Sequence, residues 1–147
     1  MSVRAIFLPP TRIAPDKMPA TGPLADKTIM VTGAAGTIGA AVSHQVAAAG
    51  GSVVLLDRQE RALDRIYDQI MALGNAPPIQ VLQELADLTA ETVDLLAGQL
   101  SEEFGKLDGL VHAAGEPPRL TPLEHLDPEH WSRLISVQLH APFLLTR

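Results

Sequence analysis

Cysteine is absent from this 147-residue chain, which excludes a disulfide framework and thiolate-based metal or redox chemistry. The chain also has no run of lysine or arginine, and its formal net charge is -6, so it lacks the basic footprint of a nucleic-acid binder. No uncharged apolar stretch approaches the roughly 18 residues that a membrane span needs, and no signal-peptide core precedes the first prolines. We therefore expect a cytoplasmic protein that binds neither nucleic acid nor membrane.

Hydrophobic residues make up 46% of the chain, which is enough for a buried core, and the length favours one domain. Prolines cluster from Pro9 to Pro23, where each removes a backbone donor and disfavours helix in the residue before it. We predict that residues 1–23 form a weakly ordered arm and residues 24–147 the folded domain. The basic residues of the arm leave a targeting role open beside that of a plain linker.

Beyond the arm, short apolar runs alternate with longer segments of helical period, a pattern typical of a parallel sheet with crossover helices. The predicted strands span residues 28–32, 53–57, 79–85 and 107–113. The predicted helices span residues 37–49 and 59–73, and two more begin after the caps Thr89 and Asp127. The first helix is expected to bury one face, made of Ile38, Val42, Val46 and Ala49. The predicted fold class is α/β, with a doubly wound parallel sheet of about four strands.

A glycine-rich run follows the first predicted strand and opens the first helix, with the sequence Gly33-Ala34-Ala35-Gly36-Thr37-Ile38-Gly39. Small residues there permit a tight turn, let the backbone approach a pyrophosphate, and leave the N–H groups of a helix N-terminus free to bind it. Asp57 ends the second predicted strand about 18 residues after Gly39, near the ~20 expected of a ribose-binding carboxylate. The loop alone could be an ordinary turn, but loop and acid together predict a dinucleotide site.

Asp57 and Arg58 point to different cofactors. The Asp57 carboxylate can accept hydrogen bonds from the ribose hydroxyls and would repel a 2′-phosphate, so NAD is the preferred dinucleotide. The Arg58 guanidinium could offset that repulsion and admit NADP. An exposed residue in the first turn of the second helix is the alternative interpretation of Arg58.

Two further segments complete a pattern: Asp87-Leu88 after the third predicted strand, and His112-Ala113-Ala114-Gly115 at the end of the fourth. With the loop and Asp57, they make the chain from about residue 24 onward resemble the short-chain dehydrogenase/reductase family. The resemblance implies a Rossmann fold and a parent that interconverts alcohol and carbonyl with NAD(P). The residues expected to contact the cofactor are Gly33, Ala35, Gly36, Thr37, Ile38, Gly39, Asp57, Arg58, Asp87, Leu88, Ala113, Ala114 and Gly115.

By this resemblance, the glycine loop binds the pyrophosphate and Asp57 binds the ribose. Asp87 and Leu88 contact the adenine, and residues 113–115 lie on the nicotinamide side. The chain departs from the usual family pattern in three ways. Thr37 takes the place of the middle glycine while Gly36 lies one residue earlier, His112 and Ala113 replace two asparagines, and Gln138 occupies the place of the active-site asparagine. The family's catalytic Ser and Tyr-x-x-x-Lys are missing, since the single tyrosine, Tyr67, is followed four residues later by Met71. We therefore expect no catalytic residue here and a chain that is inactive alone.

Three hypotheses stay open at this point: an incomplete, truncated portion of an NAD(P)-dependent oxidoreductase, a non-catalytic dinucleotide-binding module, and a non-functional product of a truncated gene. A metal site is not expected, because Asp127-Pro128 separates Glu124 and His125 from Glu129 and His130, and the His-Glu-x-x-His order is absent. Self-association is expected instead, through the open edge of the fourth strand and a last helix that is apolar nearly all round.

Overall fold

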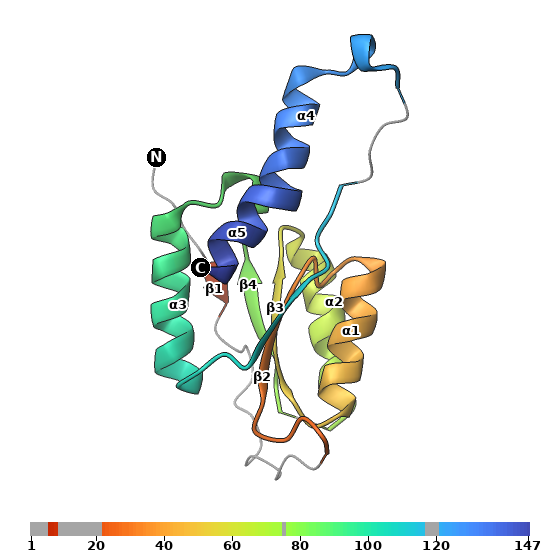
Figure 1. Ribbon diagram of the computed structural model, residues 1–147. Coiled ribbons are helices and arrows are strands. Elements are labelled where there is room, and N and C mark those ends of the chain that lie inside the picture. Colours follow the sequence, from red (N-terminus) through yellow and green to blue (C-terminus); the bar gives the residue numbers. More distant parts are fainter. Residues whose placement is uncertain (1–5, 9–21, 75, 117–120) are drawn as a thin grey trace.

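The computed structural model describes residues 6–8, 22–74, 76–116 and 121–147, and its centre is a five-stranded sheet (Figure 1). The strand order is β1-β4-β3-β2-β5. Four strands are parallel, as the sequence pattern predicts: β2 (Thr28–Thr32), β3 (Ser52–Asp57), β4 (Ile79–Leu82) and β5 (Gly109–His112). The fifth, β1 (Ile6–Leu8), pairs antiparallel with β4 and was not predicted. The rest of the predicted arm lies outside the described residues, apart from Gly22 and Pro23.

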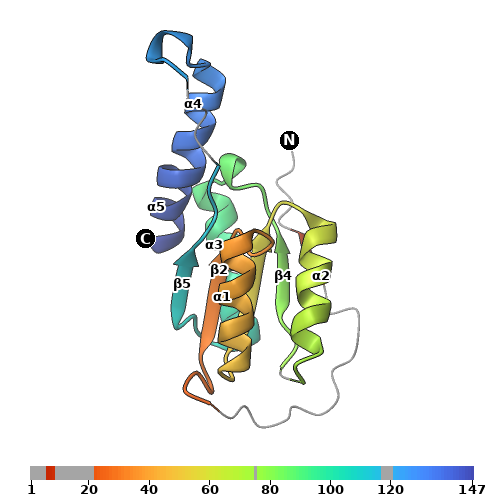
Figure 2. The same cartoon turned by 90° about the vertical axis from the view of Figure 1, so that its right-hand side faces the viewer.

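Helices cover both faces of the sheet (Figure 2). One face packs against α1 (Thr37–Ala48) and α2 (Glu60–Met71), which also contact each other. The other face packs against α3 (Ala90–Phe104) and α5 (Ala141–Thr146). The helix α4 (Pro128–Ile135), a π-helical turn η3 (Ser136–His140) and α5 follow one another without a break. Two short 3₁₀ turns, η1 (Leu85–Asp87) and η2 (Leu123–His125), complete the described elements.

Successive side chains of β3 point to opposite faces of the sheet and so contribute to the hydrophobic cores on both faces. Val53 and Leu55 point into the cluster beneath α1 and α2, while Val54 and Leu56 point into the cluster beneath α3 and α5. All four are at most 1% exposed. A central strand buried on both faces is what parallel sheets with crossover helices require, and it explains why β3 reads as a continuous apolar run.

The predicted helix caps are present. The Thr89 hydroxyl accepts the N–H of Thr92 at 3.2 Å, and the Asp127 carboxylate accepts the N–H of Glu129 at 3.1 Å with Pro128 in the first helical position. The third parallel strand ends at Leu82, earlier than predicted, because Glu84 caps the 3₁₀ turn η1 by accepting the N–H of Ala86.

The predicted buried face of α1 is partly wrong. Ile38 is 70% exposed, and α1 instead buries Gly39, Ser43, Val46 and Ala47. Close packing of Gly39 against the preceding turn sets the rotation of the helix. The Ser43 hydroxyl donates to the Gly39 carbonyl at 2.8 Å, so a polar side chain can occupy the buried face without an unpaired group.

One edge of the sheet is unpaired, and one helix projects beyond the sheet. Among the described residues, β5 pairs with β2 alone, so its other edge carries unpaired backbone groups. The α4 helix extends beyond the sheet in both ribbon views. None of the described helices is long and apolar enough to cross a membrane.

Candidate functional site

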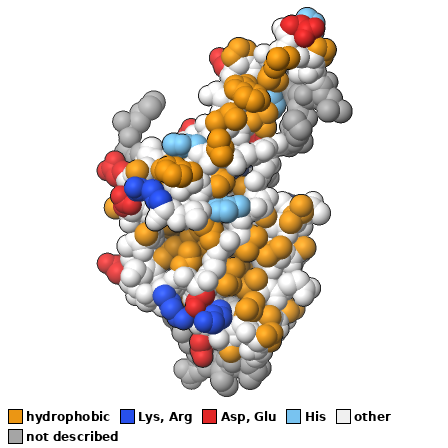
Figure 3. Space-filling view, viewed as in Figure 1, with side chains coloured by type: hydrophobic (Ala, Val, Ile, Leu, Met, Phe, Trp, Pro, Cys, Tyr) orange, Lys and Arg blue, Asp and Glu red, His pale blue; other side chains and the backbone are white. Residues whose placement is uncertain are grey.

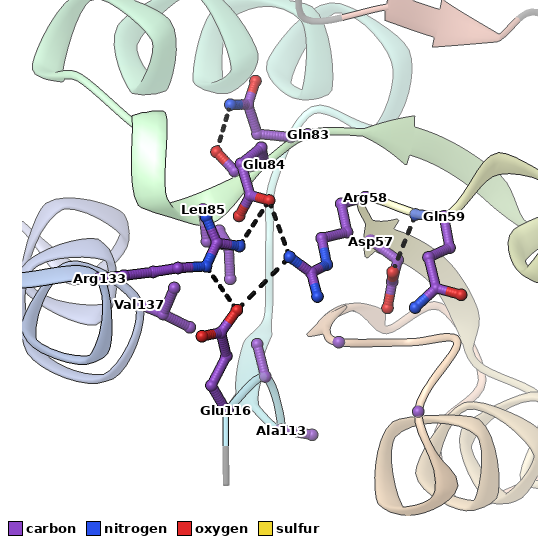
Figure 4. A pocket seen from close by; sticks show the side chains of 14 residues that line it. Asp57, Arg58, Gln59, Gln83, Glu84, Leu85, Ala113, Glu116, Arg133 and Val137 are labelled. Carbon is purple, nitrogen blue, oxygen red and sulfur yellow. Dashed lines mark hydrogen bonds and ion pairs between the residues drawn. The ribbon is translucent and has the colours of Figure 1, made fainter. Parts of the chain in front are cut away.

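The loops that follow β2, β3, β4 and β5 meet at the carboxyl edge of the sheet, where open α/β sheets bind ligands. They enclose a pocket with α4 and η3 on its remaining side (Figure 4). Its lining residues are Gly33, Gly36, Asp57, Arg58, Gln59, Gln83, Glu84, Leu85, Ala113, Ala114, Gly115, Glu116, Arg133 and Val137. The predicted loop residues of three separate strands are thus brought together.

The glycine turn is held tightly against its neighbours. Gly33 has a φ of +65°, and a Cβ atom on it would lie 2.6 Å from the Cα of Ala114. A Cβ atom on Gly39 would lie 2.0 Å from the carbonyl oxygen of Gly33. Neither position accepts a side chain, so these glycines let the loop after β5 and the first turn of α1 pack directly against the turn after β2.

The N-terminus of α1 opens from this turn without a side-chain cap. Gly36 is the N-cap residue, and the first-turn N–H groups of Thr37, Ile38 and Gly39 have no intrahelical acceptor. Thr37 and Ile38 are exposed. Unsatisfied N–H groups and the positive end of the helix dipole together make a site suited to an anion such as a pyrophosphate.

Asp57 connects the end of β3 to the glycine turn. One carboxylate oxygen accepts the N–H of Ala35 at 3.1 Å, and the other accepts the N–H of Gln59 at 3.0 Å. A carboxylate offers about four lone-pair positions, so these two bonds leave room for further donors. The acid lines the pocket beside Gly36, where it could also receive hydroxyl donors from a ligand.

Arg58 takes part in a ring of four ion pairs that spans the pocket, hereafter the charge ring. Its guanidinium lies 3.2 Å from Glu84 and 3.4 Å from Glu116. The guanidinium of Arg133 on α4 lies 2.8 Å from Glu84 and 2.6 Å from Glu116. Figure 4 shows both arginines between the two carboxylates, with Asp57 pointing away from them.

The charge ring shifts the pKa values of two of its members. Burial acts to raise the pKa of Glu84, but hydrogen bonds from Arg133, the Ala86 N–H and Arg58 outweigh it, so that pKa lies below its usual value. Hydrogen bonds to Glu84 and then Glu116 raise the pKa of the Arg133 guanidinium further above its already high value. Both shifts favour the ionised forms, the carboxylate of Glu84 and the guanidinium of Arg133.

Sequence patterns did not single out Glu84, Glu116 or Arg133. The available signal was weak: Glu84 and Glu116 each follow a predicted strand end closely, and Arg133 precedes Gln138 by little more than one helical turn. Charged residues at such positions are usually solvated, and nothing local indicates that they meet.

The remaining predicted residues divide between the pocket and its surroundings. Ala113, Ala114 and Gly115 line the pocket. Gln138 lies in the π-helical turn and donates from its amide to the carbonyl of Glu116 at 2.8 Å. The family resemblance predicts that Asp87 and Leu88 contact the adenine, but neither residue lines the pocket. The η1 turn leaves Asp87 exposed and places Leu88 in the core at 4% exposure.

Other chemistry-bearing side chains lie away from the pocket. Tyr67 is buried in α2, 8% exposed, and is not among the lining residues. Glu124 and His125 belong to η2, whereas Glu129 and His130 belong to α4. Within the described ranges, no three His, Cys, Asp or Glu side chains are grouped closely enough to hold a metal ion.

Comparisons with known proteins agree with this geometry. The family model for the short chain dehydrogenase matches residues 27–147. An uncharacterized oxidoreductase of Escherichia coli K12, YciK, is 31% identical over 124 residues, which are 84% of this chain and 49% of that protein. A bicyclic carboxyl-CoA reductase of Mycobacterium tuberculosis is 34% identical over 92% of this chain and 51% of its own length.

Solved structures give the same result. A short chain dehydrogenase of Pseudomonas syringae superposes with a TM-score of 0.82 and 40% identity, covering 92% of this chain and 55% of that one. One from Shigella flexneri, solved in complex with NADP, has a TM-score of 0.80 and 28% identity, covering 88% and 53%. The chain thus spans about half the length of the relatives that it matches. With a matching model over residues 27–147 and the glycine turn, Asp57 and the β5 loop gathered in one pocket, the chain belongs to the short-chain dehydrogenase family.

Proposed function

We propose that the pocket binds a nicotinamide dinucleotide and that the chain is the cofactor-binding part of an oxidoreductase that interconverts alcohol and carbonyl groups. One observation carries the proposal: Gly33 of the close-packed turn, Gly36 at the N-cap of α1, and Asp57 line a single pocket at the carboxyl edge of the sheet, and α1 begins there without a side-chain cap. A dinucleotide presents a pyrophosphate and a ribose diol, the two groups that these features suit.

In this proposal, the loop residues Gly33, Ala35 and Gly36, with the first turn Thr37–Gly39, hold the pyrophosphate. Asp57 accepts the hydroxyls of the adenosine ribose while keeping its bond to the Ala35 N–H. The small residues Ala113, Ala114 and Gly115 leave space for the cofactor to continue along the end of β5. NAD is favoured, because Asp57 repels a 2′-phosphate and Arg58 is engaged by two glutamates. NADP, which some structural neighbours bind, is the competing cofactor.

Under the same proposal, these 147 residues bind the cofactor but do not catalyse the reaction. The cofactor supplies the hydride, but protonation of a carbonyl oxygen needs a side-chain acid within hydrogen-bond reach of the substrate. Tyr67 lies outside the pocket, and no Tyr-x-x-x-Lys occurs in the sequence.

The test is titration of the purified chain with NADH and NADPH, followed by nicotinamide fluorescence. We expect saturable binding that is lost in Asp57→Ala and in Gly33→Val, because one variant removes the ribose acceptor and the other fills the turn. Circular dichroism of both variants separates loss of binding from loss of fold. Gly98→Ala is the matched control, since a Cβ there meets nothing within 4 Å. A folded wild-type chain that binds neither nucleotide contradicts the proposal, and alcohol-dependent NADH production by the chain alone contradicts its second part.

A further inference from the structure

The two arginines of the charge ring are not held equally. Arg133 approaches the two glutamates to 2.8 and 2.6 Å, whereas Arg58 approaches them to 3.2 and 3.4 Å. The Arg58 side chain is 49% exposed and that of Arg133 is 32% exposed. Arg58 is thus the member of the charge ring that can leave most easily.

Departure of Arg58 would leave neither glutamate unpaired. Glu84 and Glu116 both keep their ion pairs with Arg133, and Glu84 also keeps its bond from the Ala86 N–H. Leaving a partly buried carboxylate without a partner is costly, and the shared Arg133 removes that cost. The structure therefore contains an arginine beside the ribose-binding acid that can be exchanged between two sets of partners.

The position of Arg58 decides which other groups its guanidinium could bind. Arg58 directly follows Asp57, and both line the pocket with Gly33 and Gly36. Figure 4 shows the Arg58 side chain turned toward Glu84 and Glu116 and away from the Asp57 carboxylate. A phosphate on the ribose that Asp57 binds would lie within reach of a released guanidinium and would carry close to two negative charges.

We propose that Glu84 and Glu116 set the preference between the two dinucleotides, because they compete with a ribose 2′-phosphate for the Arg58 guanidinium. The inference rests on the proposed function and deepens it. In the wild-type chain, NADPH must take Arg58 from two carboxylates, whereas NADH binds with the charge ring intact. Glu84 and Glu116 thereby act as specificity-determining residues although neither is adjacent to Asp57 in the sequence.

The experiment measures the dissociation constants of NADH and NADPH for the wild-type chain, Glu84→Gln and Glu116→Gln. Each substitution weakens the hold on Arg58, so the affinity for NADPH relative to NADH should rise about fivefold, the size of one exposed ion pair. Glutamine keeps the amide oxygen that can cap η1, and Glu116→Gln provides a variant with no capping role. Glu60→Gln, an exposed acid in the first turn of α2, makes the same change in net charge outside the ring and should leave the ratio unchanged.

A second arm separates capture by Arg58 from simple loss of repulsion. In the Arg58→Gln background, Glu84→Gln and Glu116→Gln should no longer change the ratio, because no guanidinium is left to release. An equal rise in that background overturns the inference, as does an unchanged ratio in the single variants while both nucleotides still bind. If the folded wild-type chain binds neither nucleotide, the proposed function itself fails and the inference falls with it.

Discussion

The first turn of α1 rests directly on the backbone of the glycine turn, since a Cβ atom at Gly39 would lie 2.0 Å from the carbonyl oxygen of Gly33. Gly39 is also buried, and its own carbonyl accepts the Ser43 hydroxyl. The glycine therefore fixes where the helix begins relative to the strand. Because the open N–H groups of that first turn form the candidate anion site, fold and binding depend on the same contact.

Gly39→Ala should destabilise the chain, because the added methyl group meets backbone atoms that cannot move independently. Overpacking of this kind costs about 1–3 kcal/mol and occasionally more. The matched change is Gly98→Ala in α3, where the space is open and the removal of a helical glycine should add about 0.5–1 kcal/mol. Urea unfolding of the two variants gives the comparison. Equal stabilities would show that the contact at Gly39 relaxes freely.

Asp108 joins the starts of β2 and β5, and its effect should depend on pH. One carboxylate oxygen accepts the N–H of Thr28 at 3.0 Å, and the other accepts from Lys106 at 2.8 Å and Lys27 at 3.0 Å. The hydrogen bond from Lys106, followed by those from Thr28 and Lys27, holds the pKa of Asp108 well below its usual value. A carboxylate with a lowered pKa stabilises the fold above its unfolded pKa of about 3.9, and that contribution is lost as the pH falls toward the folded pKa.

Asp108→Asn should accordingly lower the unfolding temperature at neutral pH, and the difference from wild type should shrink as the pH falls below about 4. Thermal unfolding across this pH range tests the expectation. Asp68→Asn, which removes an exposed acid from α2, serves as the control and should follow the wild-type profile. A difference between Asp108→Asn and wild type that stays constant with pH would mean that the carboxylate charge is not what stabilises the junction.

Local patterns predict the parallel sheet and its helices but not the contacts between distant loops. The run from Val53 to Leu56 is apolar without interruption, so it identifies a buried strand from sequence alone. The caps Thr89 and Asp127 are likewise local, because each bonds an N–H two or three residues away. Such features need no knowledge of the tertiary structure.

The charge ring, in contrast, depends on contacts between residues that are far apart in the sequence. Its members lie at positions 58, 84, 116 and 133, and only the register of three strand ends, together with the position of α4, brings them together. The strand β1 is missed for a related reason, since three residues beside prolines carry no alternation that predicts pairing. Exposure of Ile38 was unpredictable because the tight contact at Gly39, and not hydrophobic periodicity, sets the rotation of α1.

Gln138 should order the loop after β5. Its amide donates to the carbonyl of Glu116, which links the π-helical turn to the residue that follows Ala113–Gly115. Gln138→Leu removes the donor at similar size, so we expect faster amide exchange around Glu116 and a several-fold weaker binding of NADH, with unfolding changed by about 1 kcal/mol or less. His140→Gln alters an exposed neighbour in the same turn and should change neither quantity. Unchanged amide exchange in Gln138→Leu would contradict a role in ordering the loop.

The long helix that begins at Pro128 has an exposed apolar face, from which we predict self-association. Figure 3 shows hydrophobic side chains gathered along α4. Four large apolar residues that recur every four positions are 39–64% exposed, namely Trp131, Ile135, Leu139 and Phe143. Each such side chain contributes about 1.5–3 kcal/mol when fully buried, so we propose that the chain associates with itself through this face.

Phe143→Lys and Leu139→Lys should each raise the dissociation constant of that association by about tenfold to a hundredfold, because a buried apolar contact is replaced by a charge. Sedimentation velocity over a range of protein concentrations gives the constant, and the emission of Trp131 reports whether the face is covered. Leu123→Lys makes the same chemical change at an 83% exposed position in η2, outside the four residues, and should leave association unaltered. A wild-type chain that stays monomeric at every concentration, or variants that associate as tightly as wild type, would assign the exposed face to another partner.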